Sequence, residues 1–134
     1  VLYRLFTSAQ SQPALKMEAL AALINCSVSG EVSKFLVQNM GVVKSMVELL
    51  WRQTMYTQFV TMAISNMAKD KQACRELCEL GAVHALMGLV QTPNFGKQKY
   101  ACMALANIAQ NMSEKFAGPL MNEHFVDRII KLAV

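Results

Sequence analysis

Apolar residues recur along the chain at three- and four-residue spacing, which is the period of an α-helix with one buried face. Leu77, Leu80, Val83 and Leu86 show this spacing within one segment. The alternation of apolar and polar residues that marks a half-buried strand is nearly absent, and so is the Asn-Gly turn of a tight hairpin. The pattern therefore predicts an all-α protein.

The pattern also predicts three kinds of helical segment that follow one another in a fixed order: short, middle and long. The short segments cover residues 32–39, 72–80 and 114–122, and the long segments cover residues 15–26, 54–68 and 96–110. The middle segments follow Gly41 and Gly81, and a third copy covers residues 125–132. We expect each of these glycines to allow a left-handed backbone at a sharp bend between a short helix and a middle helix.

The long segments end in a recurring pattern. The three copies read Ala-Ala-Leu-Ile-Asn-Cys, Met-Ala-Ile-Ser-Asn-Met-Ala and Met-Ala-Leu-Ala-Asn-Ile-Ala. Their asparagines, Asn25, Asn66 and Asn107, are separated by 41 residues in both cases. Pro13 and Pro93, which precede or begin two of the long segments, are 80 residues apart, or two periods. A fixed period of this length is typical of a solenoid of stacked helical units.

These features resemble armadillo repeats, which have three helices in about 40 residues, a glycine before the middle helix and an asparagine near the end of the third. The resemblance covers essentially the whole chain and implies an armadillo-like right-handed α-α superhelix of repeats of about 41 residues. HEAT repeats, with two helices each, are the near alternative, but the separate short segment before each glycine favours armadillo repeats. We expect one domain over residues 1–134, made of a partial repeat (1–27), two repeats (28–68 and 69–110) and a partial, irregular repeat (111–134).

The resemblance further implies a binding groove. In armadillo proteins the third helices line a concave groove, and the asparagine near the end of each one grips the backbone of an extended peptide. A carboxamide suits this task because it both donates and accepts hydrogen bonds. By this resemblance, Asn25, Asn66 and Asn107 are candidate partner-binding residues. The alternative is that each asparagine bonds neighbouring backbone within the fold.

Four further residues are candidates for the same groove. Met62 and Met103 lie four residues before an asparagine, and Gln58 and Lys99 lie one turn further back. Methionine adapts to varied apolar partners, although at helical spacing it also serves as ordinary core filler. Nuclear-import adaptors usually have tryptophan where these methionines stand, and the one tryptophan here, Trp51, ends a middle segment instead. We therefore do not expect the groove to bind a nuclear-import signal.

Composition and charge narrow the expected partners. The chain is 54% hydrophobic and only 16% charged, whereas an ordinary domain has about 45–50% and about 25%. A stacked repeat buries a face on each neighbour, which accounts for the excess. The net charge of +4 is spread evenly over the two halves, so we expect no nucleic-acid binding. Glu18 is the only acid on the three long segments, so we expect neutral to acidic protein or peptide partners.

Catalytic and metal-binding patterns have little support. The four cysteines lie in apolar helical segments, as buried free thiols of a reducing compartment do, so we expect an intracellular, cytoplasmic protein, with the nucleus as an alternative. Cys74, Cys78 and His84 do not have the spacing of a zinc site. His84 and His124 lack a paired nucleophile, and no glycine-rich phosphate loop occurs. We expect no enzyme, no metal, no cofactor and no membrane span.

The leading hypothesis is therefore an intracellular scaffold that binds an extended peptide or partner protein along its concave groove. A second hypothesis is structural: the chain is an internal segment of a longer solenoid. It then self-associates through apolar end helices that contain Leu2 and Leu5 at one end and Ile129, Ile130 and Leu132 at the other. A third hypothesis is a chaperone-like armadillo domain for a client such as a myosin motor.

Overall fold

The computed structural model describes residues 12–38, 40–111 and 123–133, and within them the chain forms helices and no strand. The described helices are α2 (Pro13–Ser27), α3 (Gly30–Gln38), α4 (Met40–Arg52), α5 (Thr57–Met67), α6 (Lys71–Glu79), α7 (Ala82–Val90), α8 (Phe95–Asn111) and α10 (Glu123–Ala133). The predicted all-α class is confirmed, and each unit has the three helices that the pattern predicts, although α5, expected to be a long helix, has 11 residues and the middle helix α4 has 13. The short helix expected over 114–122 lies outside the described residues.

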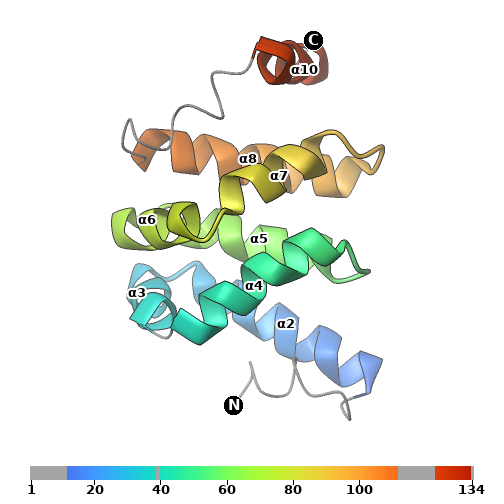
Figure 1. The fold of residues 1–134 in the computed structure, drawn as a ribbon. Helices are drawn as coiled ribbons and strands as arrows, with labels where there is room; N and C mark the ends of the chain where they lie inside the picture. Colours follow the sequence, from blue (N-terminus) through green and yellow to red (C-terminus); the bar gives the residue numbers. More distant parts are fainter. Residues whose placement is uncertain (1–11, 39, 112–122, 134) are drawn as a thin grey trace.

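Like helices lie side by side in the stack. α5 packs between α2 and α8, so the three long helices form one layer. α4 packs on α5 and α7 packs on α8, and in Figure 1 these two middle helices lie in front of that layer. α3 and α6, the short helices, pack against each other at the left edge of the view. The units α3-α4-α5 and α6-α7-α8 are therefore two copies of one three-helix arrangement.

Prolines and short polar side chains set where several helices begin. Pro13 is the first residue of α2, where its missing N–H costs no hydrogen bond. The Asp70 carboxylate accepts from the backbone N–H of Ala73 at 3.0 Å and caps α6. The Asn94 side-chain oxygen accepts from the backbone N–H of Lys97 at 2.9 Å and does the same for α8. Local sequence thus specifies these helix starts.

Only one of the two glycines expected at sharp bends takes a left-handed backbone. Gly81 has a φ of 83° between α6 and α7. The expectation was wrong for Gly41, because α4 already begins at Met40 and Gly41 is its second residue. A third bend uses Gln53, whose φ is 47°, and it delays the start of α5 to Thr57, three residues later than the pattern predicts.

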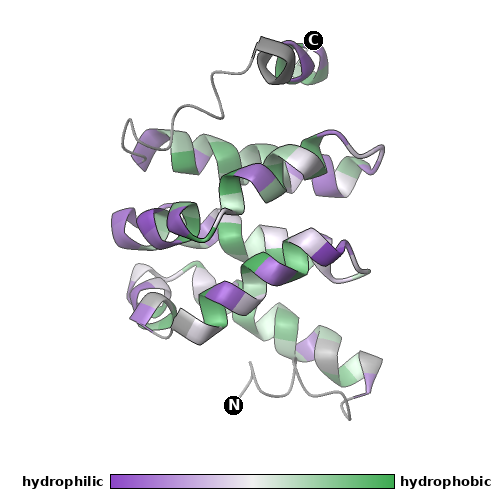
Figure 2. Cartoon of the chain, in the orientation of Figure 1, coloured by the Kyte–Doolittle hydropathy of each residue, from purple (hydrophilic) through white to green (hydrophobic). Residues whose placement is uncertain are grey.

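The core lies between the long and middle helices. Its largest fully buried side chains come mainly from α4, α5, α7 and α8 and include Leu50, Ile64, Met67, Leu86, Leu89 and Ile108. Figure 2 shows apolar residues along these helices and hydrophilic ones along the outer side of α6. Within the described ranges, every helix is too short or too polar to cross a membrane.

Candidate functional site

The candidate residues of α5 form one partly exposed strip along that helix. Gln58, Met62 and Asn66 are spaced four residues apart, so their side chains lie on one face, and each is partly exposed. The residues beside them in sequence that point inward, such as Ala63 and Ile64, are buried. The Met62 side chain also packs against the core, so one part of it contacts buried residues and another part is exposed to solvent.

The corresponding strip on α8 consists of Lys99, Met103 and Asn107. Lys99 is exposed, Met103 is 46% exposed and Asn107 is partly exposed. On α2, Asn25 is exposed at the same position of its repeat. We call the surface made by Asn25, Gln58, Met62, Asn66, Lys99, Met103 and Asn107 the ladder face. Its residues are partly or fully exposed and belong to the layer of long helices, which lies behind α4 and α7 in Figure 1.

Two of the three ladder asparagines, Asn66 and Asn107, also join successive repeats. The Asn66 amide donates to the backbone oxygen of Ile24 at 3.4 Å and to the Ser27 hydroxyl at 3.2 Å. The Asn107 amide donates to the backbone oxygen of Ser65 at 2.8 Å and to its hydroxyl at 3.3 Å. In each case the acceptor lies near the end of the preceding long helix. The alternative role considered for these asparagines, bonding to backbone within the fold, is therefore present in the structure.

This arrangement fixes which atoms of the two carboxamides remain for a ligand. A carboxamide has two N–H donors and one acceptor oxygen, and only the NH2 group can donate to a backbone carbonyl. The side-chain nitrogens of Asn66 and of Asn107 therefore donate between repeats. Within the part of the chain that the structure describes, no hydrogen bond is found to either Oδ1 atom. Asn66 and Asn107 thus offer their side-chain oxygens as acceptors, and the hydrogen bonds of their nitrogens hold these oxygens in place.

Ser27, Ser65 and Asn111 complete this network, and the sequence pattern had not singled them out. The Asn111 amide donates to the backbone oxygens of Ala68 and Asn107, both at 3.2 Å. Ser27 and Ser65 are buried. The available signal was a small hydroxyl side chain one or two residues from a ladder asparagine within an otherwise apolar segment.

Gln58 lies at the contact between α5 and α8. A Cβ added to Gly96 of α8 would meet the Gln58 carboxamide, whose Cδ atom would be 2.6 Å away. The missing side chain of Gly96 therefore leaves room for the Gln58 carboxamide at the contact between α5 and α8. Lys99 follows one turn after Gly96, with its Nζ atom 5.3 Å from the centroid of the Tyr100 ring.

The three long helices contain a slight excess of basic residues. Glu18 is the one acid in α2, α5 and α8, whereas α2 contains Lys16 and α8 contains Lys97 and Lys99. The side-chain oxygens of Asn66 and Asn107 thus share the ladder face with one ammonium group, that of Lys99. The arrangement can pair with N–H donors through the asparagines and with oxygen acceptors through Lys99.

The cysteines occupy three different environments. Cys74 and Cys78 are buried on α6, Cys102 is half-buried and Cys26 is exposed, so the expectation of buried thiols was wrong for Cys26. The equivalent positions of the next two long helices, Met67 and Ile108, are fully buried, so Cys26 is exposed at a position that the other repeats bury.

The two buried thiols of α6 are hydrogen-bonded to each other. The Cys74 thiol is also 3.7 Å from the backbone oxygen of Ile108. The bond from Cys78 lowers the pKa of Cys74, and the same bond together with burial raises the pKa of Cys78. His84 is exposed on α7, and no group of three potential metal-binding side chains occurs among the described residues.

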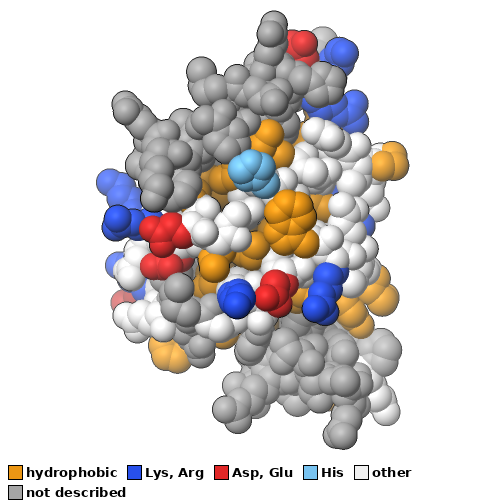
Figure 3. Space-filling view, in the orientation of Figure 1, with side chains coloured by type: hydrophobic (Ala, Val, Ile, Leu, Met, Phe, Trp, Pro, Cys, Tyr) orange, Lys and Arg blue, Asp and Glu red, His pale blue; other side chains and the backbone are white. Residues whose placement is uncertain are grey.

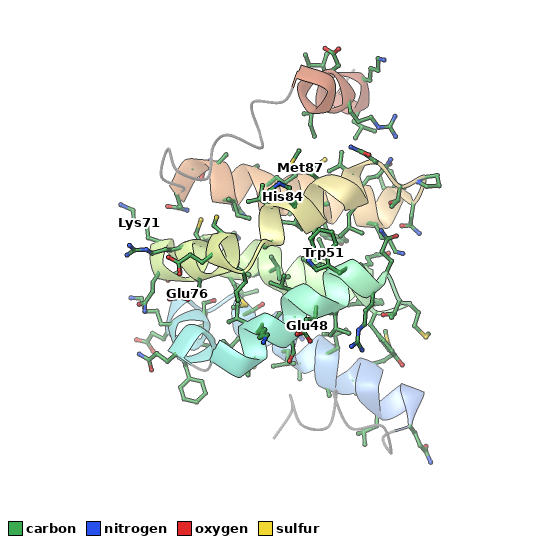
Figure 4. All side chains as sticks on the ribbon, in the orientation of Figure 1. Glu48, Trp51, Lys71, Glu76, His84 and Met87 are labelled. Carbon is green, nitrogen blue, oxygen red and sulfur yellow. The ribbon has the colours of Figure 1, made fainter. Side chains whose placement is uncertain are left out.

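Trp51 lies on the opposite side of the molecule from the ladder face. It is 58% exposed near the end of α4. Figure 4 shows Trp51 with His84 and Met87 of α7 on one side and Glu48 of α4 on the other. The same face in Figure 3 carries hydrophobic patches interrupted by single charged side chains. The tryptophan is therefore absent from the groove, as the sequence predicts.

The structure is similar to solved structures of engineered repeat proteins. One engineered protein superposes with a TM-score of 0.83 at 25% sequence identity, over 98% of this chain and 53% of its own. A designed armadillo repeat protein superposes with a TM-score of 0.83 at 22% identity, over 98% and 55%. A designed armadillo repeat protein in complex with the peptide (KR)4 gives a TM-score of 0.73 at 22% identity, over 97% and 50%. The chain therefore spans about half the length of these structures.

No protein-family model and no curated protein matches the sequence. The fold is instead identified by its repeated three-helix units and by the designed proteins that share them. The chain has an armadillo-like repeat fold, an all-α solenoid.

Proposed function

We propose that the protein is an intracellular binding scaffold that holds an extended segment of a partner protein along the ladder face. The observation that supports this most is the fixed orientation of Asn66 and Asn107, whose amides are hydrogen-bonded between repeats. A side chain that is already held in place loses little conformational freedom when a ligand binds. The remaining acceptor oxygens therefore suit recognition of a backbone.

The spacing of an extended segment matches the ladder. Along one edge of an extended chain, backbone N–H groups recur every second residue, or about 6.6–6.8 Å. Adjacent helices lie about 8–10 Å apart, so a segment crossing α2, α5 and α8 would pass an asparagine about every two to three residues, and a two-residue step would bring N–H groups of the same edge to successive asparagines. The carbonyl groups of the same edge need donors, which the Gln58 amide and the Lys99 ammonium supply.

The partner segment is neutral to acidic, with apolar side chains. Glu18 is the one acid on the three long helices, so a basic segment would find little to pair with. Met62 and Met103 supply flexible apolar contacts for side chains of varied shape. The ligand that we propose for this chain therefore differs in charge from the basic (KR)4 peptide of the designed protein.

An intracellular location and a binding rather than catalytic role complete the proposal. All four cysteines are free thiols, which supports a reducing compartment. The polar groups of the ladder face are the carboxamides of Asn25, Gln58, Asn66 and Asn107 and the ammonium group of Lys99. These groups suit hydrogen bonding to a peptide backbone, whereas covalent catalysis needs a nucleophile paired with a base.

Selection from a random peptide library displayed on phage tests the proposal. We expect selected peptides to be enriched in acidic and apolar residues. We expect their affinity to fall at least roughly tenfold in a Met103→Glu, Lys99→Glu double variant. His84→Glu is the matched control, since His84 is also exposed but lies on α7. Enrichment of basic peptides, or equal affinity for both variants at unchanged helicity, would overturn the proposal.

A further inference from the structure

The middle helices α4 and α7 carry an exposed surface that shares no residue with the ladder face. Its centre is Trp51, which is 58% exposed, although tryptophan is on average a highly buried residue. In Figure 4, Trp51 lies with Glu48 of α4 on one side and with His84 and Met87 of α7 on the other. We call the surface made by Lys44, Glu48, Trp51, Arg52, His84, Met87 and Gly88 the tryptophan face.

Gly88 leaves open space on the α7 side of this face. It lies one turn after His84 and is exposed, and a Cβ built on it would meet no heavy atom within 4 Å. A glycine inside a helix is less stable than alanine, and Gly88 does not have the left-handed φ that would require one. At the 40-residue spacing of the middle helices, Gly88 corresponds to Glu48. The second repeat therefore lacks a side chain where the first carries a charged one, and a ligand can approach α7 closely there.

The charged residues of α4 form one row along this face. Lys44, Glu48 and Arg52 are four residues apart, so they follow one another on one side of the helix, and all three are exposed. Among the described residues, no ion pair joins them. Figure 3 shows alternating basic and acidic side chains along one side of the hydrophobic patch on this face. A partner with the order acid, base, acid would match the row.

An α-helix fits the tryptophan face better than an extended segment does. The backbone groups of α4 and α7 bond within their own helices, so this face offers side chains alone. An extended segment would have to leave most of its own backbone groups to water, whereas a helix pairs them internally. Charges four residues apart on a partner helix also rise by about 6 Å, as those of α4 do, so three ion pairs can form in register.

We propose that the tryptophan face binds an amphipathic helix of a partner protein, on which an acid, a base and an acid at four-residue spacing lie beside a row of large apolar residues. The apolar row packs on the Trp51 ring and over Gly88, and the charged row pairs with α4. Trp51 supplies most of the affinity, since exposed tryptophans are frequent hot spots of interfaces. The charges select the partner, because each exposed ion pair adds little affinity while opposed like charges exclude the wrong helix.

A helical peptide without tryptophan, with Glu, Lys and Glu at four-residue spacing beside a row of leucines, is the probe. A hydrocarbon staple on its far side holds it helical, since short helices are marginal in water. Trp51 is the one tryptophan of the chain, so we expect a saturable blue shift of its fluorescence as the ring is buried. In fluorescence anisotropy with a labelled peptide, Trp51→Ala should weaken binding at least roughly tenfold. Gly88→Gln, which fills the open space, should also weaken it. Phe35→Ala is the matched control, since Phe35 is 68% exposed on α3, and should leave binding unchanged.

A charge exchange tests the pairing. A peptide with Lys, Glu and Lys should bind the chain at least roughly tenfold more weakly, and should be the preferred ligand of the Lys44→Glu, Glu48→Lys, Arg52→Glu variant. Equal affinity of both peptides for both chains, or no saturable blue shift, would overturn the proposal. A blue shift that grows with chain concentration in the absence of peptide would assign the face to a second copy and overturn it as well. The Met103→Glu, Lys99→Glu double variant should bind the peptide normally, so failure here is distinguishable from failure of the ladder face.

Discussion

Replacing Asn107 by alanine tests whether the ladder asparagines hold adjacent repeats together. The change removes two hydrogen bonds, to the Ser65 oxygen at 2.8 Å and to its hydroxyl at 3.3 Å. A hydrogen bond contributes about 0.5–1.5 kcal/mol net, and water can replace part of it at this half-exposed site. We therefore expect a loss of about 1–2 kcal/mol in the free energy of unfolding.

Asn25→Ala is the matched control. Asn25 occupies the same repeat position on α2 but is exposed, and its side chain makes no hydrogen bond within the described part of the chain. We expect its replacement to cost less than about 0.5 kcal/mol. For Asn107→Ala, a denaturant slope of about 2 kcal/mol per molar urea places the midpoint about 0.5–1 M lower. Urea unfolding followed by circular dichroism measures both. Equal midpoints for the two variants would refute a structural role for the ladder amides.

Three other changes test the fold. Gly81→Ala should lower the free energy of unfolding by about 1–2 kcal/mol, because the backbone φ of Gly81 is 83°. Gly88→Ala should raise it by up to about 1 kcal/mol, since Gly88 lies inside α7 with open space around it. Changes of the same sign in the two thermal unfolding temperatures would contradict this. Ile64→Ala should cost about 2–5 kcal/mol in urea unfolding, since Ile64 is fully buried, and a loss below about 1 kcal/mol would argue against this core. In thiol labelling followed by mass spectrometry, Cys26 should react at once and Cys74 only on unfolding; equal rates would show that α6 is not packed as described.

The helices and their order could be predicted from the sequence because each helix buries one face, and its apolar residues therefore recur at helical spacing. The 41-residue spacing of Asn25, Asn66 and Asn107 likewise predicts equivalent positions on stacked helices, and the structure places them on α2, α5 and α8. Repetition is informative here since each repeat must present the same face to its neighbours. Their role in ligand binding stays a prediction.

Other features depend on contacts that spacing does not encode. The direction of the Asn66 and Asn107 amides follows from carbonyl groups about 42 residues away in sequence. Gly41 falls inside α4 because that helix begins one residue earlier than the glycine suggests. Cys26 is exposed, although Met67 and Ile108 at the same position of the next two long helices are fully buried. Each of these outcomes is decided by the neighbouring helix rather than by the local sequence.

The most direct test of the central claim, that the ladder face is the binding surface, is a nuclear magnetic resonance titration of the labelled chain with a library-selected peptide. The side-chain resonances of Met62, Asn66, Met103 and Asn107 should shift as the peptide saturates the chain. The indole resonance of Trp51, the one tryptophan, should stay in place because it lies on the opposite face. A shift of the Trp51 resonance with no change at Asn66 and Asn107 would contradict the claim.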